Sequence, residues 1–278
     1  MTDQAISHLD AEALARELLS AQEADQMVPI LPSARPGFDL DTAYAVEAAL
    51  KRFREAAGHR AVGLKVGYAN KAMWRVLKLE TLVWGHMYDD TVHYSVNNSA
   101  TLTLPHCRSL KIEPEIVFGL KQPITTEGLD AIAALRATEW LALGFEIIDC
   151  PFADWKFQPS DFVASFGLHA ALVIGERLSV RPDSIETMVD ELARLKVRVS
   201  KNGEFVEEGS GKNSLKNPAS CLAELGAAVV RRFPDEPLRS GEIISSGTLT
   251  AGHLTERGDR WTVEAEGLSL PPLELSVT

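Results

Sequence analysis

Cysteine is scarce in this chain, which has three cysteines among 278 residues. They are Cys107, Cys150 and Cys221, and they show no paired spacing. Any disulfide scheme leaves one of them over, which argues against a disulfide framework. The sequence therefore predicts a reducing, cytoplasmic setting.

Positive charge is also in short supply. The 28 lysines and arginines face 39 acidic residues, which gives a formal net charge of −11. Nucleic-acid binding usually requires a basic surface, so we expect no nucleic-acid partner. An acidic surface also repels small organic acids, and an anionic substrate therefore needs a metal ion or a locally placed cation.

Long apolar runs are missing as well. No run approaches the roughly 20 apolar residues of a membrane-spanning helix, and residues 1–4 show no basic region of signal-peptide type. We therefore expect an unexported protein with no membrane partner. No internal repeat or clear linker divides the chain, whose length fits one large domain or a compact domain with a helical N-terminal extension.

The most informative segment is residues 111–118, where Glu113 and Glu115 stand in an apolar, β-branched run. In a strand, residues i and i+2 share a face, so both carboxylates would point the same way. Two like charges beside buried aliphatic side chains are costly unless a proton or a cation lies between them. A third acid, Glu146, comes from another strand-like run, residues 141–149. Carboxylates from two strands suit an oxygen-preferring ion such as Mg²⁺.

A structural alternative remains open at this point. Glu113 and Glu115 could lie on the solvated face of an antiparallel strand, with their apolar neighbours in the core. The alternation in residues 112–116 is not a clean period of two and does not decide between the two interpretations. Glu146 favours a metal site only if the two strands are neighbours.

Local patterns predict a mixed sheet preceded by a helical cap. Apolar spacing predicts a helix within residues 6–27, capped at Ser7 or Asp10, and Asn202-Gly203 predicts a hairpin turn. The other expected elements are a helix from about residue 41 that ends near Gly58, a strand at 61–67, a short helix through Met73 and Leu77, and helices near 129–137 and 218–232.

Several segments in order resemble the hydratase and decarboxylase branch of the fumarylacetoacetate hydrolase superfamily, over nearly the whole chain. The resemblance rests on residues 63–67, 72–73, 111–118, 145–149, and 241–247 followed by 258–259, the last two matching a C-terminal pair of strands. It implies an α+β fold with a mixed, distorted β-roll or barrel of the superfamily's C-terminal-domain type. A helical N-terminal cap would cover residues 1–60, and the catalytic β-roll residues 61–278, as one compact unit.

The resemblance further implies a metal-dependent lyase, a hydratase or decarboxylase, that acts on a small 2-oxo or 2-hydroxydienoic acid. It implies a homo-oligomer in which Mg²⁺ or Mn²⁺ supports catalysis. The implied site residues are Glu113, Glu115 and Glu146 as metal ligands, Lys65 as a catalytic residue, and Ser246 and Thr250 as substrate-binding residues. A 2-oxo carboxylate can chelate a metal ion through its keto and carboxylate oxygens, and the ion can then stabilise an enolate.

Lys65 could supply the positive charge that such a site needs to bind an anionic substrate. Three carboxylates around a dication remain net negative, so an anionic substrate requires a nearby cation. A strand lysine usually sends its ammonium group to solvent. However, the apolar residues Leu64 and Val66 would share the opposite face of the strand, and this weakens the interpretation of Lys65 as a solvent-exposed lysine. A metal ion nearby is expected to depress the pKa of this lysine, which could then move a proton.

The chain departs from the family pattern at two places. Val83 stands where the hydratases carry an aspartate that transfers a proton, so either His86, Asp89 or Glu80 replaces it or the reaction does not need that step. Residues 164–169 are also more apolar than in the family. We expect His169 to be a hydrogen-bonded core or interface residue and Cys150 a small buried hydrophobic residue. Together the departures favour metal-assisted enolate chemistry and weaken the case for hydration.

Two other functions stay open. An acylpyruvate-type C–C hydrolase would need a histidine–glutamate pair that activates water. The sequence shows no convincing pair of this kind, and His86 and His106 are the histidines that could belong to one. A catalytically weak paralogue that acts as a partner subunit would show no metal binding. The residues do not identify the tail of the substrate in any of these cases.

Overall fold

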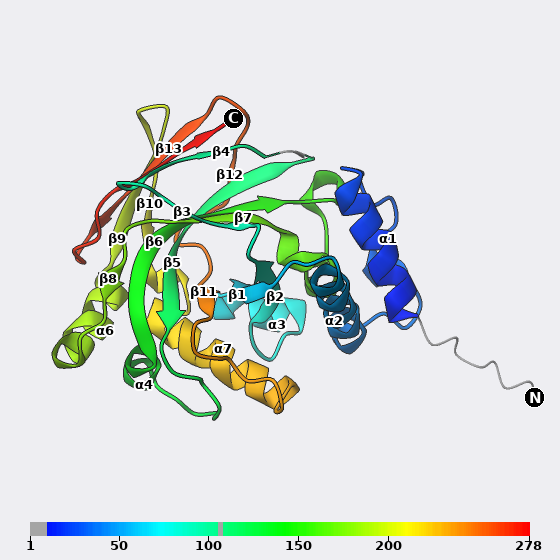
Figure 1. The fold of residues 1–278 in the computed structure, drawn as a ribbon, viewed down its shortest axis with the longest axis horizontal. Coiled ribbons are helices and arrows are strands. Elements are labelled where there is room, and N and C mark those ends of the chain that lie inside the picture. The colour runs from blue at the N-terminus through cyan, green and yellow to red at the C-terminus, as the bar shows by residue number, and fades with distance from the viewer. Residues whose placement is uncertain (1–9, 105–107) are drawn as a thin grey trace, which may run out of the picture.

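A computed structural model describes residues 10–104 and 108–278 of the chain. Figure 1 shows a large, strongly curved sheet with a smaller sheet at its upper edge, while helices cover the lower edge and one side. The helices are α1 (Ala11–Glu23), α2 (Leu40–Ala56), α3 (Lys71–Leu77), α4 (Ala131–Arg136), α5 (Pro159–Ala164), α6 (Ile185–Arg194) and α7 (Pro218–Arg232).

The strands form two sheets. They are β1 (Ala61–Gly67), β2 (Val83–Tyr88), β3 (Val92–Tyr94), β4 (Ser99–Leu102), β5 (Leu110–Leu120), β6 (Thr138–Asp149), β7 (His169–Ile174), β8 (Leu178–Ser179), β9 (Lys196–Lys201), β10 (Glu204–Ser210), β11 (Ile243–Ser245), β12 (His253–Leu254), β13 (Arg260–Glu266) and β14 (Leu273–Val277). The larger sheet has the order β2-β1-β11-β5-β6-β7-β3, with β12 on β5 and β8 on β6. The smaller sheet has the order β10-β9-β13-β14-β4.

Both sheets are mixed. The pairs β1–β11, β3–β7 and β4–β14 are parallel, and the remaining pairs are antiparallel. The predicted α+β class and mixed, distorted sheet are therefore confirmed. The two C-terminal strands suggested by the resemblance do form, but β11 lies in the larger sheet and β13 in the smaller one, so they do not pair with each other.

Strands β5 and β6 form the centre of the larger sheet and pair antiparallel along most of their length. Their apolar residues are buried on both faces, which explains why neither strand shows a clean alternation in sequence. Ile112, Ile116 and Phe118 belong to the main core. Glu115 and Glu146 are fully buried, so the interpretation that places the acids on a solvated strand face is wrong.

The N-terminal helices begin where short polar side chains satisfy free amide groups. The Asp10 carboxylate accepts from the amides of Glu12 and Ala13 and begins α1, whereas Ser7 lies outside the described residues. Helices α1 and α2 pack together, and α2 also packs on α5. Their buried Leu14 and Leu50 belong to the same core as the sheet. The division of the chain near residue 60 stays a prediction.

Other local predictions hold. The bounds of β1 and α7 match the predicted ranges, and β9 and β10 form the hairpin expected around Asn202-Gly203. Both turn residues have positive φ, 53° and 86°, as the tight two-residue hairpin turn requires. Within the described ranges, no helix is long and apolar enough to cross a membrane.

Candidate functional site

Three carboxylates meet on one face of the β5–β6 pair. The antiparallel register places Glu113 directly opposite Glu146, and Glu115 follows two residues along β5 on the same face. One oxygen of each of the three residues lies within 4.8 Å of the others. The strands proved to be neighbours, as a shared site requires, and the three acids singled out in the sequence come together.

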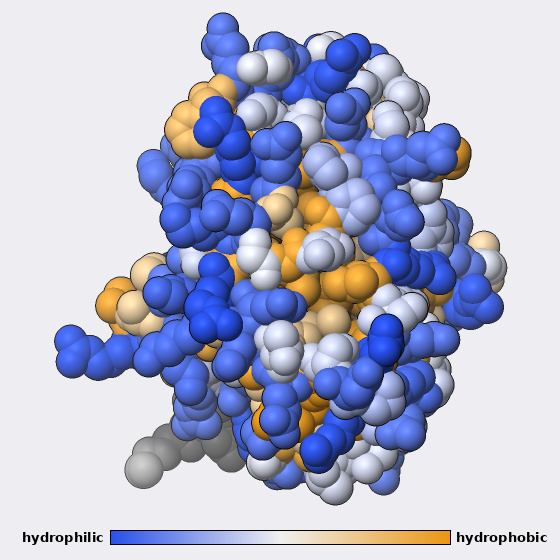
Figure 2. Space-filling model, turned by 90° about the vertical axis from the view of Figure 1, so that its left-hand side faces the viewer, coloured by the Kyte–Doolittle hydropathy of each residue, from blue (hydrophilic) through white to orange (hydrophobic). Residues whose placement is uncertain are grey.

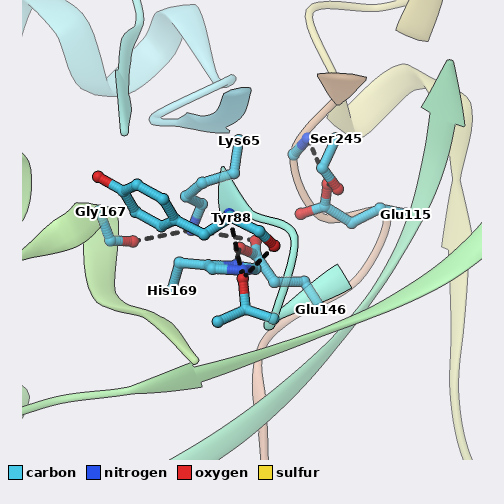
Figure 3. A network of polar contacts seen from close by, with 9 residues as sticks. Lys65, Tyr88, Glu115, Glu146, Gly167, His169 and Ser245 are labelled. Carbon is cyan, nitrogen blue, oxygen red and sulfur yellow. Dashed lines mark hydrogen bonds and ion pairs between the residues drawn. The ribbon is translucent and has the colours of Figure 1, made fainter. Parts of the chain in front are cut away.

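Hydrogen bonds from other strands fix two of these carboxylates (Figure 3). Glu115 Oε2 accepts from Ser245 Oγ at 2.5 Å and from the Gly247 amide at 2.8 Å. Glu146 Oε1 lies 2.9 Å from His169 Nδ1. Glu115 Oε1 has no hydrogen-bond partner among the described residues, although it is buried. A buried carboxylate oxygen left in this way points to a ligand that the protein itself does not supply.

The charges of the cluster are poorly compensated. Burial raises the pKa of Glu113 to about 7, and Glu146 adds to this effect against the opposing influence of Lys65. Burial, reinforced by Glu146 and Glu113, raises the pKa of Glu115 well above its ordinary value. Burial acts in the same direction on Glu146, but Lys65 and His169 outweigh it and lower that pKa. An all-oxygen donor set with this charge and an unpaired oxygen fits a hard divalent cation.

Lys65 lies beside the carboxylates and is only 2% exposed. Its Nζ donates to the Gly167 carbonyl at 2.9 Å, lies 3.0 Å from Glu146 Oε2, and is 4.8 Å from the centre of the Phe162 ring. The interpretation of Lys65 as a solvated strand lysine is therefore wrong. We expected a depressed pKa, and burial does act in that direction, but the negative charges of the carboxylate cluster outweigh it and raise the pKa of Lys65.

A close backbone approach holds the lysine in place. Residues 166–168 form a 3₁₀ turn packed against β2, and Gly167 has a φ of +60°. A Cβ atom on Gly167 would lie 2.8 Å from Lys65 Cδ, and one on Gly85 would lie 2.9 Å from the Gly167 amide nitrogen. Only glycine at both positions lets this turn bring its carbonyl to the ammonium group.

A cavity of about 390 Å³ opens onto Lys65 and Glu113. Its walls combine aromatic and uncharged polar side chains, among them Tyr68, Asn70, Trp155, Phe157, Phe162, Asn213, Thr248 and Thr250. Thr250 thus lines the cavity, as a substrate-binding residue should. Ser246 does not line it and is fully buried, while its carbonyl accepts from Ser214 Oγ at 2.6 Å. Binding of substrate by either residue stays a prediction.

Sequence analysis missed two residues that hold the carboxylates. Ser245 was overlooked in favour of its neighbour Ser246, although its place opposite Val117 puts it on the face of Glu115. His169 is buried and hydrogen-bonded, as expected, but its partners are Glu146 and Thr91 Oγ1, at 2.9 Å each. Cys150 is buried as expected, and burial raises the pKa of its thiol.

Val83 is 1% exposed and packs in the main core. It pairs with Gly67 on the β1–β2 ribbon, on the same face as Lys65 but outside the cavity lining. None of the three residues considered as substitutes for the missing aspartate, Glu80, His86 and Asp89, lines the cavity. Apart from the candidate metal ligand Glu113, the described lining of the cavity therefore contains no carboxylate.

The histidine–glutamate pair sought for a hydrolase lies in the wrong place. His86 Nδ1 is 2.5 Å from Glu47 Oε1, and both residues line a second cavity. His86 pairs with Leu64, whereas Lys65 pairs with Gly85, so His86 faces away from the carboxylates across the ribbon. His106 lies outside the described residues. Among the described residues, no histidine lines the cavity at Lys65.

Comparison with known proteins gives a consistent result. Residues 74–277 match the family model described as fumarylacetoacetate (FAA) hydrolase C-terminal. The chain is 30% identical over 257 residues to 2-hydroxyhexa-2,4-dienoate hydratase of Comamonas testosteroni, covering 92% of this chain and 94% of that protein. It is also 30% identical over 256 residues to 4-oxalocrotonate decarboxylase of Pseudomonas sp. (strain CF600), covering 92% and 93%.

Solved structures agree with the sequence comparisons. The fold matches 4-oxalocrotonate decarboxylase from Pseudomonas putida G7, complexed with magnesium and adipate, with a TM-score of 0.86 and 26% identity. That match covers 99% of this chain and 100% of the other.

Proposed function

The chain belongs to the fumarylacetoacetate hydrolase C-terminal family, and we propose that it is a divalent-metal-dependent lyase acting on a 2-oxo or 2-hydroxydienoic acid. The observation that carries this proposal is the cluster of three buried or half-buried carboxylates beside a buried lysine. The relatives that match over nearly their whole length include a hydratase and a decarboxylase.

Glu113, Glu115 and Glu146 would hold Mg²⁺ or Mn²⁺. When bound, such an ion supplies a Lewis acid that stabilises negative charge on the 2-oxo group of the substrate. The protein fixes the donor atoms in advance, because Ser245 holds Glu115 and His169 holds Glu146.

Lys65 would bind the anionic head of the substrate. A lysine ammonium has three N–H donors, and here the Gly167 carbonyl and Glu146 occupy two of its directions. The third remains for a substrate carboxylate or a developing enolate oxygen. Phe162 lines the same cavity, with its ring centre 4.8 Å from Lys65 Nζ, and an apolar wall of this kind strengthens an electrostatic interaction relative to bulk water.

The absence of an acid at Val83 bears on which of the two reactions found among the relatives this protein catalyses. Hydration of a dienol needs a proton delivered at carbon and an activated water, which a nearby acid assists. Loss of CO₂ or ketonisation of an enol chiefly requires that the enolate be stabilised, which the carboxylate cluster and Lys65 would support. We therefore favour decarboxylation or tautomerisation over hydration.

The test compares three reactions of the purified protein: release of CO₂ from 2-oxohex-3-enedioate, ketonisation of the enol, and addition of water to 2-hydroxypenta-2,4-dienoate. We expect the first two to be faster than the third. Val83→Asp places a carboxylate on the face of β2 that Lys65 shares, and in folded variants we expect it to raise the hydration rate above that of Val83→Asn, the control of equal size. Efficient hydration by the unmodified protein, with no gain in Val83→Asp, would contradict this choice of reaction.

The protein is further proposed to form a homo-oligomer in the cytoplasm. Figure 2 shows apolar side chains gathered in the middle of one face and rimmed by polar ones. A contiguous apolar surface of this kind is typical of a protein–protein interface. Sedimentation of the purified protein should give an assembly larger than 30.4 kDa, and a monomer at micromolar concentration would contradict the proposal.

A further inference from the structure

A second cavity, of about 290 Å³, lies behind the strand that carries Lys65. Leu64 lines this cavity, whereas its neighbour Lys65 lines the cavity at the carboxylate cluster, because successive residues of a strand point to opposite faces. The lining comes from α2, β1, β2, the end of α7 and the segment 236–242. The described linings of the two cavities share no residue, so the second cavity is a separate site.

The walls of the second cavity are largely apolar. Leu64, Trp84, Val229 and Leu238 all line it and are buried. The Phe233 ring lies edge-on to the Trp84 ring, with the ring centres 6.4 Å apart, and also lines the cavity. Aromatic rings accept both an apolar ligand body and a positive charge placed over the ring face. These walls therefore suit a ligand that combines the two.

Glu47 is the only charged residue of the described lining that is buried, with 4% of its surface exposed. Its Oε1 accepts from the backbone amide of His86 at 3.1 Å and lies 2.5 Å from His86 Nδ1. Its Oε2 makes no hydrogen bond with any described residue. When Nδ1 carries the imidazole proton, His86 is neutral and donates to a carboxylate that keeps its charge. A buried negative charge is costly without a cation beside it.

The other charges around the cavity cancel one another. Three basic and three acidic residues complete the charged part of the described lining: Lys51, Arg52, Arg239, Glu55, Glu236 and Glu242. Two of the basic residues already have partners, since Lys51 lies 3.2 Å from Glu236 and Arg52 lies 2.9 Å from Glu12. With neutral His86, Glu47 therefore leaves the lining net negative, which favours a cationic ligand.

Two acceptor atoms are free to hold such a ligand. One is Glu47 Oε2, and the other is Nε2 of neutral His86, which likewise has no partner within the part of the chain that the structure describes. A primary ammonium group carries a positive charge and three N–H donors. We propose that the second cavity binds a small organic cation, with its ammonium group at Glu47 and His86 and its apolar or aromatic body against Trp84 and Phe233.

Benzylamine and benzyl alcohol, two ligands of nearly equal shape, test the proposal. Above the ordinary pKa of histidine and below that of the amine, they differ chiefly in positive charge. In an NMR titration with excess Mg²⁺, the wild-type protein should bind benzylamine about tenfold more tightly or better, as expected for a charge-assisted hydrogen bond. Glu47→Gln keeps the shape of the side chain and should abolish this preference while benzyl alcohol still binds. Glu55→Gln removes the same charge from an exposed lining residue of the same helix and should keep the preference.

The other outcomes would overturn the proposal. They include equal binding of the two ligands by the wild-type protein and binding of neither ligand. Equal weakening of both ligands in Glu47→Gln would show that the carboxylate serves only the fold of the cavity. Loss of benzylamine binding in Glu113→Gln, with binding retained in Glu47→Gln, would place the cation at the carboxylate cluster instead. None of these results depends on turnover, so this inference can fail while the proposed function stands.

Discussion

Replacing Lys65 with methionine is expected to lower turnover by about 10²- to 10³-fold, the usual cost of removing one preorganised group that stabilises developing negative charge. Methionine keeps much of the length and apolar volume of the lysine but removes the ammonium that lies 3.0 Å from Glu146. The measurement is kcat/KM at saturating Mg²⁺ for the substrate found to react fastest.

The control for this variant is Lys71→Met. Lys71 lies outside the cavity, with its ammonium 5.3 Å from the centre of the Trp74 ring. It should leave kcat/KM unchanged. Wild-type turnover in a folded Lys65→Met protein would assign the buried lysine a structural role only.

Glu113→Gln is expected to remove most affinity for Mg²⁺ or Mn²⁺. The loss should exceed the about 10- to 100-fold effect typical of changing a group that merely supports a ligand. Glutamine has the same shape but no charge, so the change removes one of the three carboxylates without opening a cavity. Calorimetry measures the affinity directly. The rise in melting temperature on adding Mg²⁺ should also disappear, because a ligand stabilises only a protein that binds it.

A second group of possible ligands provides the matched control. His59, Asp89 and Asp90 lie close together, but both aspartates are exposed, and Asp90 already pairs with Arg54 at 2.7 Å. Asp89→Asn should therefore leave metal affinity unchanged. Unchanged affinity in Glu113→Gln, or its loss in Asp89→Asn, would show that the ion binds elsewhere.

The sequence was informative about the carboxylate cluster because its geometry is largely local. Glu113 and Glu115 share a face by strand periodicity, and Glu146 stands in the next long apolar run. Strands close in the chain often pair, and β5 and β6 do so. The overall fold was predictable for a different reason, since several family segments occur in the right order.

The partners of these residues were not predictable because they depend on sheet topology. Ser245 reaches Glu115 only because β11, far away in sequence, inserts between β1 and β5. His86 seemed a possible substitute for the missing aspartate because it is close to Val83 in the chain. The register of β1 and β2 directs it to the other face, which residue types alone do not reveal.

The pairing of Glu113 with Glu146 also bears on how the sheet forms. The β5–β6 register is regular from Leu110 to Gly119, with its irregularity confined to the far end. A slip of one residue would turn one strand's acids to the opposite face and disperse the cluster. An ion held by all three carboxylates would bind only the correctly paired form and stabilise it by mass action. The ion proposed for catalysis would then also select the native strand alignment over its slipped alternatives during folding.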